Sequence, residues 1–160
     1  FAVDNLLGNW DSYSGPIINN YYLRSNSSNK FTFIPSGVDQ TFGENRETKV
    51  TLDTYTFAMD KPLVGYPWVQ LSHKKDAIER GLLFTKCLAY KPCFTLYMQE
   101  LRNASAKATA IKLPTLMVNA AKVFDPFAND DVRAEQKRNL VYLAAQQKKV
   151  AALIKFYKIK

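Results

Sequence analysis

Residues 17–35, with the sequence IINNYYLRSNSSNKFTFIP, predict a β-hairpin. Residues 17–24 are rich in β-branched and aromatic side chains, and phenylalanine alternates with other residues in 30–35. Both compositions are typical of strands. The polar residues 25–29 between them are of the types that favour turns. Two antiparallel strands joined by a short turn follow from this pattern.

On either side of the hairpin the sequence changes in character. Residues 1–8 predict the end of a helix stopped by Gly8. Residues 36–48 predict an exposed loop, and residues 50–59 a further strand. Near residue 70 the short, turn-punctuated segments give way to long helical patterns. We therefore predict one domain with a hairpin region at 1–70 and a helical region at 71–160.

The second region predicts four helices. Their apolar residues recur at helical spacing near 74–89 and 92–109, in a third helix that begins at Pro114, and at 131–157. Asn129 or Asp130 is placed to cap the last helix. The expected fold class is α+β, with a small antiparallel sheet packed on a C-terminal helical bundle. Six aromatic residues are expected in the core under the hairpin: Trp10, Tyr21, Tyr22, Phe31, Phe33 and Trp68.

Composition excludes some classes of protein and leaves others open. The chain is 47% hydrophobic, too apolar for a disordered protein, and no run approaches the roughly 20 apolar residues that span a membrane. Two cysteines, Cys87 and Cys93, and a single histidine cannot complete a zinc site. The cysteines predict either a disulfide across a helix–helix junction or two buried thiols. With the sequons at residues 26–28 and 103–105, the disulfide favours a secreted or cell-surface protein.

Charge is unevenly distributed along the chain. The net charge is +8, but residues 1–60 carry a net −3 and residues 61–160 a net +11. Solvated lysine faces on helices account for most of this basic character, although attraction to anionic surfaces is an alternative. The basic helical region contains no recognised nucleic-acid motif, so no nucleic-acid partner is expected.

Three polar residues are predicted to meet at the open end of the hairpin. Asn20 lies at the start of the first strand and Asp39 follows the second, so a tight hairpin brings them close together. Asp11 precedes the hairpin by one loop. Carboxylate and amide oxygens are ligands that Mg²⁺ or Mn²⁺ prefers, and a second carboxylate could accept a proton from a hydroxyl. Phosphoryl transfer requires this combination.

The same motifs carry a resemblance to a known family. Gly-Asn-Trp-Asp at 8–11, Asn-Asn-Tyr-Tyr-Leu at 19–23 and Asp-Gln-Thr-Phe-Gly at 39–43, with the second strand between the last two, resemble the core of the CotH (spore coat protein H-like) kinases. These are atypical, secreted or surface kinase-like proteins that use ATP and a divalent metal to phosphorylate proteins. The match is strongest over residues 1–43 and continues more weakly to about 135.

The resemblance implies a role for each residue. Asp11 is implied as the catalytic base, with Asn20 and Asp39 binding the metal and, through it, ATP; Asn19 fits the family pattern less well. The order along the chain is that of protein kinases, although Asp11 and Asn20 are nine residues apart. Without the resemblance, each residue could instead serve a turn or satisfy backbone groups. Many family members carry an acidic residue where this chain has Gly37, which predicts a weaker metal site.

The expected function is that of the C-lobe portion of an atypical protein kinase, transferring phosphate from ATP to hydroxyls of a protein substrate. Residues 1–10 contain no lysine to hold the α- and β-phosphates, so an N-terminal lobe of the same protein is expected to supply it. These 160 residues alone are expected to be inactive. Two alternatives are an inactive secreted or cell-surface adhesion or interaction module with a kinase-like fold, and a basic anion-binding helical domain.

Overall fold

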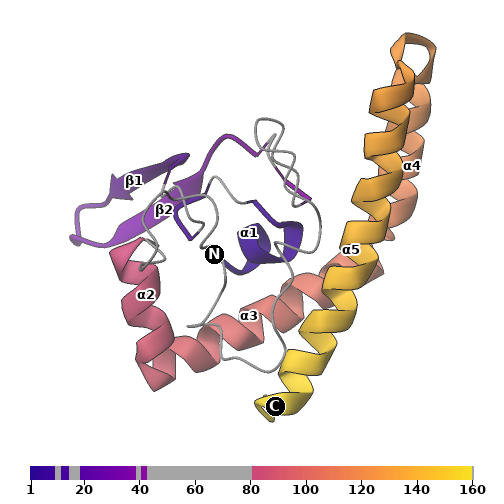
Figure 1. Ribbon diagram of the computed structural model, residues 1–160. Helices are drawn as coiled ribbons and strands as arrows, with labels where there is room; N and C mark the ends of the chain where they lie inside the picture. The colour runs from indigo at the N-terminus through magenta and orange to yellow at the C-terminus, as the bar shows by residue number, and fades with distance from the viewer. Residues whose placement is uncertain (10–11, 15–18, 39–40, 43–80, 160) are drawn as a thin grey trace, which may run out of the picture.

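The computed structural model describes residues 1–9, 12–14, 19–38, 41–42 and 81–159 (Figure 1). The described residues form an α+β fold, as the sequence predicts. The elements are α1 (Ala2–Leu7), β1 (Tyr21–Ser25), β2 (Phe31–Pro35), α2 (Leu82–Ala89), α3 (Lys91–Ala110), α4 (Leu113–Phe124), the 3-10 turn η3 (Asp125–Phe127) and α5 (Asp130–Phe156). The predicted strand at 50–59, residues 74–80 of the predicted helix, Trp10 and Trp68 lie outside the described residues.

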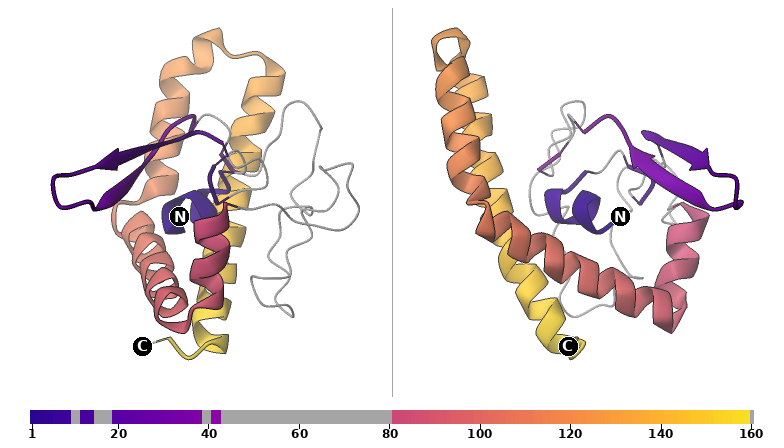
Figure 2. Two further views of the ribbon diagram at one scale, coloured as in Figure 1. Left: turned by 90° about the vertical axis from the view of Figure 1, so that its left-hand side faces the viewer. Right: turned by 180° about the vertical axis from the view of Figure 1, so that it is seen from behind.

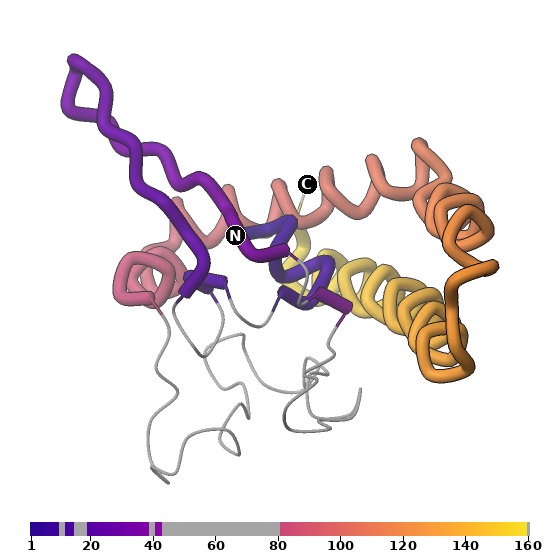
Figure 3. Tube along the Cα trace, turned by 90° about the horizontal axis from the view of Figure 1, so that it is seen from above, coloured from indigo at the N-terminus to yellow at the C-terminus, as the bar shows by residue number. Residues whose placement is uncertain are grey.

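The predicted hairpin is confirmed. β1 and β2 pair antiparallel, with Tyr21 opposite Pro35 at the open end and Ser25 opposite Phe31 at the turn. Figure 3, seen from above, shows the turn end of the hairpin extending away from the helices. The hairpin therefore has an open end near the N-terminal helix and a free tip.

The prediction that all the hairpin aromatics are core residues is wrong for two of them. Phe33 and Tyr21 pack together and against Tyr13. Phe31 and Tyr22 are instead 69% and 66% exposed. Successive side chains of a strand point to opposite faces, which separates Tyr22 from Tyr21. Phe31 shares a face with Phe33 but lies two residues nearer the free tip.

The core forms where α1, α3 and the second half of α5 meet. α1 contacts both longer helices, and α3 and α5 also contact each other (Figure 2). The side chains at the centre are fully buried because they lie at helical spacing on the facing sides of these helices. The buried cluster consists of Leu6, Phe84, Leu88, Tyr97, Met98, Leu101, Ala108, Val150 and Leu153.

A disulfide joins α2 to α3. Cys87 lies in the last turn of α2 and Cys93 in the first turn of α3, and the two sulfurs are bonded. Of the two sequence-based alternatives, the disulfide across a helix junction is therefore the one observed. Pro92 lies in the first turn of α3, where the missing N–H of proline is no loss.

α4, η3 and the first half of α5 form a two-helix arm that extends beyond the core (Figure 1). Asn129 caps α5 by accepting a hydrogen bond from the Val132 backbone N–H at 2.9 Å, which confirms one of the two predicted caps. Pro114 lies in the first turn of α4, also as predicted. Among the described residues, no helix combines the length and the hydrophobicity needed to cross a membrane.

Candidate functional site

The segment that leads from α1 toward Asp11 is fixed by polar contacts. Gly8 ends α1 with φ of 66°, the left-handed conformation that suits glycine. Asn9 follows and is buried; its backbone N–H donates to the Asp4 carbonyl at 2.8 Å, and its Nδ2 donates to Asp4 Oδ1 at 3.3 Å. The chain therefore leaves α1 in a defined direction, two residues before the predicted base.

Two buried serines follow Asp11. Ser12 and Ser14 are 2% and 3% exposed, and their hydroxyl oxygens are 3.1 Å apart. Asn5 of α1 donates through Nδ2 to Ser14 Oγ at 3.3 Å. Buried hydroxyls are costly unless they are hydrogen-bonded, and this network satisfies them. The described residues on both sides of Asp11 are thus anchored to α1.

Tyr13 links this segment to the hairpin and to α2. Its ring packs against Phe33, with ring centroids 4.8 Å apart. Its carbonyl accepts from the Gly81 N–H, and its hydroxyl accepts from the Leu83 N–H, both at 3.1 Å. A Cβ on Gly81 would lie 2.1 Å from the Tyr13 ring, so glycine is required for this approach.

Asn20 lies at the open end of the hairpin, against the residue that follows β2. Its carbonyl accepts from the Ser36 N–H at 3.0 Å. Its side-chain amide lies so close to Gly37 that a Cβ there would approach within 2.5 Å of Asn20 Cγ. Asn19, the alternative considered from the sequence, is exposed. Of the two asparagines, Asn20 is therefore the one that faces the chain leading to Asp39.

The segment that follows Asp39 returns to the end of α1. The Phe42 N–H donates to the Leu7 carbonyl, and the Phe42 ring contacts Tyr142 edge-on, with centroids 6.5 Å apart. Residues 41–42 therefore lie beside residues 7–8. Asp11 and Asp39 themselves lie outside the described residues, but described residues near each of them are in contact.

The described residues supply one part of the donor set that a divalent metal needs. Among the described residues, no group of three or more His, Cys, Asp or Glu side chains is close enough to hold a metal ion. Asn20 offers an amide oxygen of the type that Mg²⁺ accepts, but the two carboxylates of the predicted site are outside this part of the chain. Asn9 adds a buried Oδ1 that has no hydrogen-bond partner among the described residues.

Sequence reasoning missed the residues that anchor the site. Asn5, Ser12, Tyr13 and Ser14 carry the network described above, yet small polar residues beside Asp11 are equally typical of any turn. The only signal was the Ser-Tyr-Ser sequence directly after Asp11, and it does not reveal the partner helices.

The contact between Gly37 and Asn20 leads to a prediction. Gly37→Ala is expected to lower the free energy of unfolding by about 1–3 kcal/mol, because the left-handed φ of 60° disfavours a Cβ and the Asn20 amide must move. In an Asn20→Ala background the steric part disappears, and the cost should fall to about 1 kcal/mol. Urea denaturation of the four variants measures both values. An equal cost in the two backgrounds would mean that Asn20 does not occupy this space.

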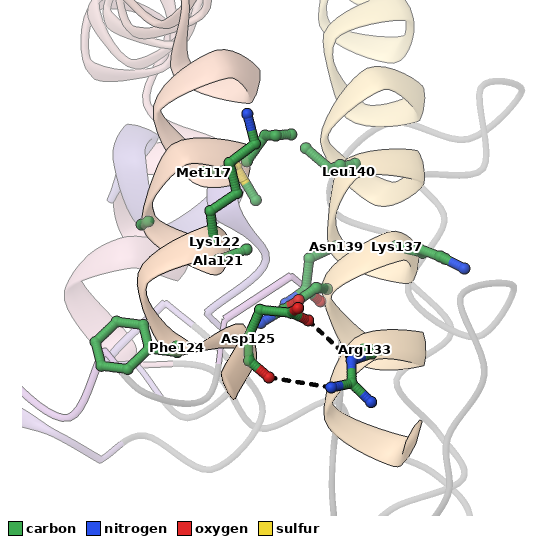
Figure 4. Close-up of a pocket in the computed structure, with 12 residues that line it drawn as sticks. Met117, Ala121, Lys122, Phe124, Asp125, Arg133, Lys137, Asn139 and Leu140 are labelled. Atoms are coloured by element: carbon green, nitrogen blue, oxygen red, sulfur yellow. Dashed lines mark hydrogen bonds and ion pairs between the residues drawn. The ribbon is translucent and has the colours of Figure 1, made fainter. Parts of the chain in front are cut away.

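A groove lies in the arm, on elements other than those of the predicted site. The groove has a volume of about 500 Å³ and runs between α4 and α5. Figure 4 shows Met117 and Ala121 of α4 and Leu140 of α5 on its two sides. At the η3 end, Arg133 donates to Asp125 Oδ1 at 2.8 Å and to the Asp125 carbonyl at 3.0 Å. The hydrogen bond to Asp125 and its negative charge raise the pKa of Arg133, so the guanidinium stays charged.

No protein-family model, curated protein or solved structure matches this chain. The resemblance to the CotH family therefore remains a prediction from the sequence motifs.

Proposed function

We propose that this chain forms the metal-binding and catalytic-base part of an atypical protein kinase of the CotH type, with a fold related to a kinase C-lobe. The observation that carries the proposal is a pair of contacts, one on each side of Asp39 in the chain. The open end of the hairpin joins Asn20 to Gly37, two residues before Asp39, and Phe42 is bonded to Leu7 at the end of the helix that precedes Asp11. Asn20, and the carboxylates Asp11 and Asp39 that these segments precede or follow in the sequence, are of the residue types that phosphoryl transfer uses.

Each residue has a task under this proposal. Asp11 accepts the proton of a serine, threonine or tyrosine hydroxyl on the substrate protein as that oxygen attacks the γ-phosphate of ATP. Asn20 and Asp39 hold Mg²⁺ or Mn²⁺, and the metal neutralises charge on the phosphates when it is bound. The network of Asn5, Ser12 and Ser14 anchors the residues that follow Asp11 to α1. A lysine that holds the α- and β-phosphates is expected from an N-terminal lobe of the same protein.

Incorporation of labelled phosphate tests the proposal. The protein encoded by the whole open reading frame that contains this chain is incubated with labelled ATP and either Mg²⁺ or Mn²⁺. Label is expected in protein, and Asp39→Ala should remove it. Asp131→Ala is the matched control, because it removes an exposed carboxylate in the first turn of α5, far along the chain from the site. A folded protein that incorporates no label with either metal rules the proposal out.

A non-catalytic interaction module, secreted or displayed at the cell surface, is the second candidate, and the arm is the observation that favours it. α4 has no buried residue, and Phe124, which lines the groove, is 62% exposed. Val123 and Phe127, close to it in the sequence, are 69% and 88% exposed. Exposed apolar patches of this kind mark sites of protein association. An apolar groove between two helices suits an amphipathic helix of a partner protein.

The arm and the candidate catalytic site can be separated experimentally. Met117→Glu places a charge in the groove and is expected to weaken partner binding at least tenfold, whereas Asp39→Ala should leave partner binding unchanged. Ala151→Glu, on an exposed part of α5 away from the groove, is the charge-matched control. Partner capture from the native secretion medium, quantified for each variant, gives the readout. Equal capture by wild type and Met117→Glu would exclude the groove as the docking site.

A further inference from the structure

The tip of the hairpin carries a glycosylation sequon in a favourable conformation. Asn26, Ser27 and Ser28 form the turn between β1 and β2, and every residue from 22 to 32 is exposed. Figure 3 shows this tip projecting away from the helices. An enzyme that modifies Asn26 could therefore approach it without displacing other described elements.

The hydrogen bonds of Asn26 leave its amide nitrogen available. Asn26 Oδ1 accepts from the backbone N–H groups of Ser28 and Lys30, each at 3.0 Å. Because both partners are donors, the atom that faces them must be the amide oxygen. Within the described part of the chain, Nδ2 has no hydrogen-bond partner. Two donors on the oxygen also polarise the amide and make its N–H groups more acidic.

We propose that Asn26 is a site of N-linked glycosylation. The reaction joins Nδ2 to the anomeric carbon of an oligosaccharide supplied as a lipid-linked pyrophosphate. The new C–N bond replaces the C–O bond to the pyrophosphate, which leaves with its lipid, while Nδ2 gives up one proton to a base of the transferase. Ser28, two residues after Asn26, supplies the hydroxyl that defines the acceptor motif.

The second sequon is a poorer acceptor in the folded chain. Asn103 lies in the interior of α3, with Ala104 and Ser105 in the same helix. Residues i and i+2 of a helix do not face each other, so the hydroxyl of Ser105 is turned away from the Asn103 amide. Using this sequon requires local unfolding of α3. Asn26 should therefore carry more glycan than Asn103.

The disulfide gives independent support. Cys87 and Cys93 are bonded, and disulfides form and persist in oxidising compartments such as the lumen of the endoplasmic reticulum. Asparagine-linked glycans belong to secreted proteins. The inference thus rests on the proposed secretion of the protein but not on any kinase activity, so its failure and that of the proposed activity are distinguishable.

Secretion from a eukaryotic cell tests the inference. The full protein that contains this chain is expressed with a signal peptide, and intact mass is measured before and after enzymatic removal of N-glycans. We expect the mass to fall on treatment, and residue 26 to become aspartate because the enzyme hydrolyses the glycosylated amide. Asn26→Gln and Ser28→Ala should each abolish this modification, whereas Asn103→Gln should leave it unchanged.

Ser28→Ala removes the sequon without disturbing the turn, so a loss of glycan in this variant cannot be due to misfolding. The hydrogen bond from residue 28 to Asn26 uses its backbone N–H, so the turn survives this substitution. Ser28→Thr should retain the glycan because it keeps the hydroxyl. The inference is overturned if secreted, disulfide-bonded wild type carries no glycan on Asn26, or if Asn103 is the more highly occupied of the two.

Discussion

Asp11→Asn is expected to lower kcat for phosphoryl transfer by about 10²–10⁴-fold, the range that general-base catalysis contributes. Asparagine has nearly the same shape as aspartate but cannot accept the proton. The buried neighbours Asn9 and Ser12 should hold the segment in place, so the fold is expected to survive. Initial rates at varied ATP and metal concentration measure kcat, and thermal unfolding of the variant shows whether the fold is intact.

Replacing Asp11 and replacing Asp39 should change different kinetic parameters. Asp11→Asn should leave the metal concentration for half-maximal activity unchanged, because this residue does not bind the metal in the proposed mechanism. Asp39→Ala should raise that concentration at least tenfold, because it removes a metal ligand. If Asp11→Asn raises the metal requirement and Asp39→Ala changes only kcat, the two roles are exchanged. If neither variant reduces activity, the proposed site is wrong.

Local patterns were sufficient to predict most of the described secondary structure. The hairpin, the stop at Gly8, the proline at the start of α4 and the cap at Asn129 depend on residue types with strong backbone preferences. These preferences act within a few residues of each position, so the sequence shows them directly. The helix boundaries predicted from apolar periodicity are correct to within one or two residues for α3 and α5.

Contacts between distant segments were not predictable in the same way. The bond from Leu83 to Tyr13 joins residues 70 positions apart, and Gln147 donates to Thr109 across 38 positions. The residues around each of these positions do not indicate which distant residue it contacts. The exposure of Phe31 has the same origin, since the extent to which a hairpin is covered depends on what packs beside it.

The candidate site contains both a locally determined contact and a contact between distant segments. Pairing within the hairpin sets the position of Asn20 opposite Ser36 and Gly37, and the register of a short hairpin follows from its turn. The contact of Phe42 with Leu7 depends instead on the packing of α1 against α5, which places Tyr142 beside both segments. Glycine stands where distant segments come closest: Gly8 lies against Tyr142, Gly37 against Asn20 and Gly81 against Tyr13.

Gly8→Ala is expected to have the largest effect on stability, lowering the free energy of unfolding by about 2–5 kcal/mol. The φ of 66° costs an alanine about 1–2 kcal/mol. The new Cβ would also lie 2.0 Å from the hydroxyl oxygen of Tyr142. Tyr142 is 2% exposed, and its hydroxyl oxygen accepts a hydrogen bond from Gln146 Nε2. Its ring therefore cannot move aside as a surface side chain would.

A double-mutant cycle separates the steric part from the backbone part. In a Tyr142→Ala background the clash is absent, so Gly8→Ala should cost only the backbone part of about 1–2 kcal/mol. Urea unfolding curves of the wild type, both single variants and the double variant provide the coupling energy. A coupling near zero would show that Tyr142 does not cover Gly8. A large coupling would establish that Tyr142 of α5 fixes the end of α1 at Gly8.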